Sequence, residues 1–189
     1  MLLRTLALAV LFAPATALAG PSLVDVKGTM KWVSDAPVEK IVGTADGKGS
    51  LTIDFDDLTQ ISGAVTVAVA TMKSGNDKRD GHLRSPEWLD AANHPNITYT
   101  IKSVKITEAT TGDAVKKATV EATGDFTLHG KTQPLTATVS LKWKGAKVKV
   151  TTAFNISLDD YAVEGKKGIV GNKVGKQIAV TVKLKGKAN

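Results

Sequence analysis

Apolar and polar residues alternate along most of this chain, as they do in strands that bury one face. In the C-terminal half, every second residue is apolar or small from Val120 to Leu128 and from Leu135 to Trp143. The same spacing returns in 148–158 and in 178–184. His129 to Thr132 and Gly145-Ala146 separate the first three segments, and we expect the chain to turn there.

The N-terminal half carries a weaker form of the same pattern. Leu23 to Ser34 predicts a first strand, and Pro37 with the polar residues up to Gly49 predicts an interruption before a strand at 51–55. Residues 61–69 and 97–106 alternate again, but the parity shifts near Ser103, which predicts a β-bulge. About eight strands with one apolar face each predict an all-β, antiparallel fold that shares a single interior. A closed barrel of this size holds either a packed core or one small ligand, and the pattern leaves both open.

The segment from Asp77 to Tyr99 interrupts the strands with a helix-like stretch. Ser85 followed by Pro86 predicts a helix start, since the serine can accept from free backbone N–H groups and proline suits the first helical position. Trp88 and Leu89 then form an apolar side. We expect this short helical insert to cap the barrel interior.

The first residues resemble a targeting signal. Arg4 precedes an apolar run, and Ala17-Leu18-Ala19 matches a cleavage site, so residues 1–19 are predicted to be a cleaved signal peptide and 20–189 a single domain. The chain has no cysteine, which excludes disulfides and thiolate chemistry and favours the bacterial periplasm for an exported protein.

The net charge of +7 is compatible with acidic partners, including a membrane surface. Lysines gather in the predicted hairpin at 142–149 and in the loop at 166–176. Few exposed aromatic residues accompany them, which argues against nucleic acid as a partner. Transient contact with a membrane surface and a homodimer both stay open.

The sequence contains no convincing catalytic constellation, so no catalytic residue, metal or cofactor is predicted. The three histidines, His82, His94 and His129, lack the short spacing of metal ligands. His82 and His94 can converge across the insert, but local hydrogen bonding is the favoured explanation.

Three patches of the sequence resemble the YceI-like family of exported bacterial proteins. The first runs from Arg79 to Asp90 and on through Pro95 and Tyr99, the second from Gly124 to Pro134, and the third comprises Gly171 to Val174. The resemblance implies a lipocalin-like extended barrel whose apolar interior holds an isoprenoid, a quinone-like molecule or a fatty lipid. The family's usual histidines near the first strand have no counterpart here.

This resemblance implies a periplasmic binding or carrier protein rather than an enzyme. Arg79, His82 or Arg84 would then meet the ligand's head group, with surface ion pairs to Asp77, Asp80 or Glu87 as the alternative. A second alternative is a structural or stress-related interaction protein with a filled barrel. The residues expected to line the interior are Ile53, Phe55, Val67, Leu83, Trp88, Leu89, Tyr99, Ile101, Phe126, Leu128, Leu141, Trp143, Phe154, Ile156 and Val180.

Overall fold

The computed structural model describes residues 20–35, 39–110, 114–165 and 175–189. The predicted signal peptide and most of the loop at 166–176, including the Gly171 to Val174 patch, lie outside these residues. The strands are β1 (Pro21–Asp35), β2 (Lys40–Asp54), β3 (Ser62–Ala68), β4 (Asn96–Thr110), β5 (Lys116–Leu128), β6 (Lys131–Lys144), β7 (Lys147–Ser157) and β8 (Gln177–Ala188). One α-helix, α1 (Asp77–Arg84), and three short 3₁₀ helices, η1 (Leu58–Gln60), η2 (Val69–Thr71) and η3 (Leu158–Tyr161), complete the described elements.

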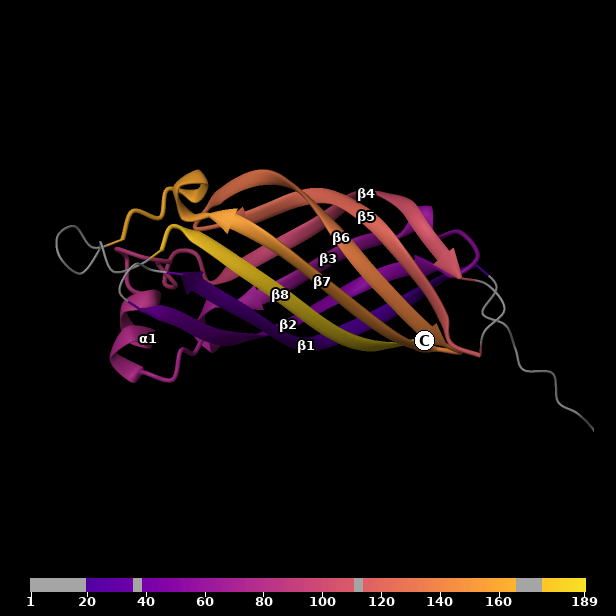
Figure 1. The fold of residues 1–189 in the computed structure, drawn as a ribbon, viewed down its shortest axis with the longest axis horizontal. Helices are drawn as coiled ribbons and strands as arrows, with labels where there is room; N and C mark the ends of the chain where they lie inside the picture. Colours follow the sequence, from indigo (N-terminus) through magenta and orange to yellow (C-terminus); the bar gives the residue numbers. More distant parts are fainter. Residues whose placement is uncertain (1–19, 36–38, 111–113, 166–174) are drawn as a thin grey trace, which may run out of the picture.

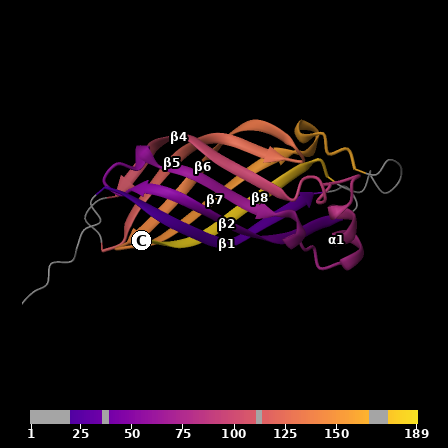
Figure 2. The same ribbon diagram turned by 180° about the vertical axis from the view of Figure 1, so that it is seen from behind.

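The eight strands form a closed antiparallel barrel in chain order. Strand β1 pairs with β2 on one side and with β8 on the other, which closes the sheet and removes its edges. The barrel is elongated, and α1 and the η3 segment lie at the same end, away from the C-terminus (Figures 1 and 2). The predicted all-β barrel is therefore confirmed.

Strand β2 is longer than the sequence pattern predicted. The polar stretch before Gly49 was expected to interrupt the strands, but the described part of it, from Lys40, continues the ladder with β1. Its inward positions include Gly43, Ala45 and Gly47, so burial alternates there without large apolar side chains. At Gly43 an added Cβ would come within 2.2 Å of the Trp32 ring, because the indole occupies that space. The small inward residues, which weaken the hydrophobic pattern of this strand, thus leave room for the Trp32 ring.

Strand β4 carries the predicted change of parity. Its register with β5 shifts between Ile101 and Ser103, and a second shift follows between Ile106 and Glu108. The first shift confirms the predicted bulge. Bulges increase local twist and bend a strand, which helps a long sheet to close.

The insert is helical in a different place from the prediction. Helix α1 ends at Arg84, and Ser85 is its C-cap rather than its N-cap. Asn76 caps the start by accepting from the backbone N–H of Arg79 at 3.0 Å. Because Pro86 disfavours helical geometry in the residue before it, the Ser-Pro pair ends this helix instead of starting one. Trp88 and Leu89 follow in turns and are nevertheless buried.

Candidate functional site

The described part of the chain lines two cavities inside the barrel. The first, of about 320 Å³, is at the α1 end and is bounded by both the barrel wall and the insert. The second, of about 110 Å³, is lined by side chains of all eight strands. Met30, Ile97 and Phe126 line both cavities, so these three side chains stand where the two spaces meet.

Most residues predicted to line the interior border one of these cavities. The first cavity is lined by Leu83, Trp88, Leu89, Phe126, Leu128, Ile156 and Val180. The second is lined by Ile53, Val67, Tyr99, Ile101, Phe126, Leu141 and Phe154. Phe55 and Trp143 border neither, because their rings pack on each other, with centroids 5.9 Å apart, in the apolar core away from the insert.

The aromatic residues of the barrel shape the boundary between the cavities. The Phe126 ring lies edge-on to Phe154 at 5.8 Å and to Tyr161 at 5.6 Å. Aromatic pairs prefer such tilted arrangements, which hold the rings in place. The opposite side of the boundary includes Met30, whose unbranched side chain adapts its shape more easily.

The second cavity is almost entirely apolar. Among the described residues that line it there is no carboxylate, amine or imidazole. Its phenol, Tyr99, donates to the carbonyl oxygens of Ala122 at 2.8 Å and Leu135 at 3.2 Å. Burial raises the pKa of Tyr99 to about 12. The hydroxyl is thus tied to the wall and stays protonated at neutral pH.

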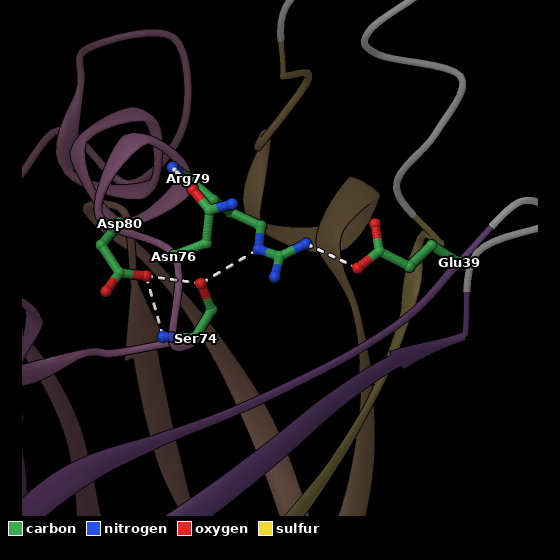
Figure 3. A network of polar contacts seen from close by, with 5 residues as sticks. All are labelled: Glu39, Ser74, Asn76, Arg79 and Asp80. Carbon is green, nitrogen blue, oxygen red and sulfur yellow. Dashed lines mark hydrogen bonds and ion pairs between the residues drawn. The ribbon is translucent and has the colours of Figure 1, made fainter.

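Polar groups gather instead at the α1 end of the first cavity. Arg79 lines this cavity and donates from Nε to the Ser74 hydroxyl at 3.0 Å and from Nη1 to Glu39 at 3.0 Å (Figure 3). No described residue accepts a hydrogen bond from its Nη2. The predicted alternative partners for Arg79 were Asp77, Asp80 and Glu87, whereas the ion pair in the structure is with Glu39.

Asp80 supports this arrangement from inside the helix. It is 5% exposed and accepts hydrogen bonds from the backbone N–H and the hydroxyl of Ser74 (Figure 3). Burial alone would raise its pKa, but the Ser74 hydrogen bonds and the nearby Arg84 and Arg79 outweigh burial, and the pKa is lowered. A charged Asp80 therefore holds Ser74, which in turn positions Arg79.

The other two predicted head-group residues lie differently. His82 is exposed and lines the first cavity. Arg84 is not among the lining residues, because its Nη1 donates to the backbone carbonyl oxygen of Met72 at 3.3 Å. Only Arg79 and His82 of the predicted three border the cavity.

Two polar residues of β1 that the sequence prediction missed also line the first cavity. Trp32 is 5% exposed, and its indole Nε1 has no hydrogen-bond partner in the described part of the chain. Ser34 is 1% exposed and donates to the carbonyl oxygen of Gly175 at 3.1 Å. Trp32 falls on the same face of this strand as Val24 and Val26 by its even spacing, but no local pattern indicates that its N–H is left free.

The described residues contain no helix that is long and apolar enough to cross a membrane.

A family model described as YceI-like domain matches residues 23–186. The chain is 27% identical over 181 residues to Protein YceI of Escherichia coli O6:H1, an alignment that covers 90% of each chain. It also resembles BcnA of Burkholderia cenocepacia, with a TM-score of 0.68, 19% identity and coverage of 86% of this chain and 95% of that one. A polyisoprenoid binding domain from Saccharophagus degradans, implicated in plant cell wall breakdown, gives a TM-score of 0.69, 15% identity and coverage of 90% and 99%.

Proposed function

Since this chain belongs to the YceI-like domain family, we propose that it binds a lipid with a long isoprenoid or similar apolar tail and carries it as a non-catalytic binding protein. The observation that carries this proposal is the pair of cavities that meet at Met30, Ile97 and Phe126, with charged side chains at one end only. The description of the Saccharophagus degradans neighbour as polyisoprenoid binding is consistent with it.

The distribution of polar groups sets the direction of the ligand. A tail in the second cavity meets apolar walls and loses contact with water, which is favourable by about 25 cal/mol per Å² of apolar surface. A polar head group there would leave its hydrogen bonds unmade, at a cost of roughly 1–3 kcal/mol for each group. The tail therefore points into the barrel and the head group lies beside α1.

The residues at the α1 end favour a head group that accepts hydrogen bonds. Arg79 offers Nη2, and Trp32 offers an indole N–H that has no partner among the described residues. A quinone carbonyl or a phosphate oxygen accepts from both kinds of donor, and guanidinium groups bind phosphate especially well. Trp88 and Leu89 of the insert cover the tail below this head group.

Bound lipid can be tested directly. The protein is purified under non-denaturing conditions from the organism that makes it, and its organic extract is analysed by mass spectrometry. We expect one class of isoprenoid or acyl lipid at close to one molecule per protein. In vitro, quinones with tails of increasing length should quench tryptophan fluorescence, because Trp32 and Trp88 line the first cavity. No bound lipid and no quenching would favour an interaction protein with a filled barrel instead.

We also place this function in the periplasm, after export and removal of residues 1–19. The positive charge at Arg4, the apolar run that follows it and the Ala17-Leu18-Ala19 cleavage pattern support this location. N-terminal sequencing of the mature protein from a periplasmic extract tests it. A mature chain that begins at Met1 would contradict it.

A row of lysines on the outer wall supports transient contact with an anionic membrane. Six exposed lysines lie directly opposite one another across six adjacent strands, from β5 through the closure to β2. Like charges in cross-strand register destabilise a sheet, so an external anion would relieve their repulsion. The row is Lys117, Lys142, Lys149, Lys185, Lys27 and Lys48.

Vesicle binding tests this contact. We expect the protein to sediment with vesicles containing phosphatidylglycerol but not with pure phosphatidylcholine, and to be released by salt. The double variant Lys149→Glu/Lys185→Glu should bind at least tenfold more weakly. The control Lys73→Glu/Lys131→Glu makes the same change in net charge away from the row. Equal loss in both variants would mean that net charge alone, and not this row, governs binding.

A further inference from the structure

Asp90, His94 and His129 meet at the rim of the barrel, outside the two cavities. Their nearest ligand atoms all lie within 4.8 Å of one another, although His129 is 35 residues from His94 in the chain. We propose that these three side chains bind a divalent transition-metal ion of the zinc type, and that this ion ties the insert to the barrel.

The insert presents Asp90 and His94 on one side of a tight turn. The backbone N–H of His94 donates to the carbonyl oxygen of Asp90 at 2.7 Å, and Asp90 itself has a positive φ of 45°. The Asn93 amide donates to one carboxylate oxygen, Oδ2, at 2.8 Å. This hydrogen bond orients the carboxylate and leaves its other oxygen, Oδ1, free to act as a ligand.

The state of Asp90 Oδ1 indicates that a cation binds here. Asp90 Oδ1 is buried and has no hydrogen-bond partner in the described part of the chain. A buried carboxylate oxygen without a partner is costly, so such atoms in folded proteins are nearly always paired with a donor or a cation. The two imidazoles beside it are the groups that most often complete a metal site with a carboxylate.

The barrel contributes His129 from the turn between β5 and β6. His129 has a φ of 51° and Gly130 a φ of 73°, the left-handed pair that a tight hairpin requires. An added Cβ on Gly130 would come within 2.6 Å of the His94 ring, so only glycine lets the hairpin approach the insert this closely. The two imidazole rings lie 5.2 Å apart between centroids at 79°.

A backbone carbonyl sets the tautomer of His129. Its Nδ1 lies 3.3 Å from the carbonyl oxygen of Tyr161 in η3. When Nδ1–H donates to this oxygen, Nε2 carries the lone pair and is available to a metal. Metal-binding histidines commonly have such an outer hydrogen bond, which fixes the ring and increases the basicity of the coordinating nitrogen.

The ligand set selects the class of metal. Two imidazoles and one carboxylate suit zinc, cobalt or nickel, whereas magnesium and calcium prefer oxygen ligands only. Bonds of 2.0–2.1 Å in a tetrahedral site place ligand atoms roughly 3.4 Å apart, so the side chains need only close slightly by rotation. Three protein ligands leave one coordination position for water.

Binding of the metal ion would restrict the movement of the insert relative to the barrel. Asp90 and His94 follow directly after Trp88 and Leu89, which line the first cavity, and His129 belongs to the barrel. An ion held by all three would fasten the insert against the hairpin. Hydrogen exchange of the backbone amides in 85–94 should therefore slow when the ion binds, whether or not a lipid is present.

The experiment uses the mature, tag-free protein after treatment with EDTA. We expect isothermal calorimetry with Zn²⁺ alone to show one site with a Kd of micromolar or below, and saturating Zn²⁺ to raise the melting temperature by several degrees. Co²⁺ should give the visible absorption of a four- or five-coordinate site. Asp90→Asn, His94→Asn and His129→Asn should each weaken Zn²⁺ binding by at least thirtyfold.

Asparagine is chosen because it tolerates the positive φ of Asp90 and His129, so these variants should keep their fold, which circular dichroism checks. His82→Asn removes the third histidine, which is outside the cluster, and should leave Zn²⁺ affinity unchanged. Stoichiometric binding that survives the loss of His129, or a Kd above 1 mM in the unmodified protein, would overturn the proposal. Neither result would affect the proposed lipid binding, which is measured without metal.

Discussion

Filling the second cavity with a phenyl ring tests whether the two cavities hold one continuous tail. Ala137 on β6 is 6% exposed, lines the second cavity and pairs with Ala122 of β5. The substitution Ala137→Phe places a ring in the cavity of about 110 Å³. Because free space receives the ring, we expect little loss of stability, whereas overpacking a filled core costs about 1–3 kcal/mol.

The expected loss of affinity follows from the tail that the ring displaces. A ring of this size excludes about one isoprene unit, or five carbons, and each buried methylene contributes about 0.8 kcal/mol, which gives about 4 kcal/mol. The excluded end of the tail stays mobile and recovers part of its ordering cost. We therefore expect a net loss of about 2–3 kcal/mol, which is roughly a 30- to 150-fold increase in Kd.

Tryptophan quenching by quinones with one to eight isoprene units measures this effect. In the unmodified protein, affinity should rise with tail length until both cavities are filled. In Ala137→Phe the rise should stop earlier, while the shortest quinones bind as before. Thr138→Phe is the matched control, since the neighbouring side chain is exposed on the outer face of β6. Unchanged affinity for long tails in a folded Ala137→Phe protein would refute the continuous path.

Three further substitutions test the cap at Trp88, the barrel wall at Tyr99 and the hydrogen bonds between Asp80 and Ser74 beside α1. Trp88→Ala removes a buried indole from the cap and should lower the free energy of unfolding by about 3–5 kcal/mol and speed lipid release. Denaturant titration measures the first effect and stopped-flow fluorescence quenching the second. Unchanged values of both would contradict the placement of Trp88 in the cap. Burial raises the pKa of Tyr99 to about 12, so the contribution of this residue to stability is complete below pH 10 and is lost as the pH rises towards 12. Tyr99→Phe should lower the free energy of unfolding by about 1 kcal/mol at pH 7. In denaturant titrations the variant should also lose less stability at alkaline pH than the unmodified protein. The pKa of Asp80 is lowered, so the stabilisation by this carboxylate is present above the ordinary aspartate pKa near 3.8 and disappears as the pH falls below that value. Asp80→Asn should lower the free energy of unfolding by about 1.5–3 kcal/mol at pH 7 and make acid unfolding less steep. An unaltered acid transition would argue against the role of the Ser74 hydrogen bonds.

The period of two in the sequence was sufficient for the strands with large inward residues. It predicted the all-β antiparallel fold, the hairpin turns at His129 and Gly145, and the bulge near Ser103, all of which the structure confirms. The resemblance to the YceI-like family added the closed barrel, which the structure also confirms. The sequence pattern failed at the start of β2, where Gly43, Ala45 and Gly47 occupy inward positions and carry no hydrophobic signal. It also placed the helix of the insert too late, because Ser85-Pro86 satisfies the rules for a helix end as well as for a start.

The features that decide the candidate sites come from the pairing of strands that are far apart in the chain. Alternation states which face of a strand is buried, but it carries no information on which residues of distant strands lie opposite each other. Pairing of β2 with β3, continued by the bridge between Thr44 and Lys73, brings Glu39 to Arg79, and pairing of β4 with β5 brings His94 to His129. The lysine row likewise depends on register through six strands. Local sequence thus determined the wall of the barrel, whereas the pairing of distant segments decided the polar end of the cavity and the Asp90, His94 and His129 cluster, because those contacts exist only once strands far apart in the chain have paired.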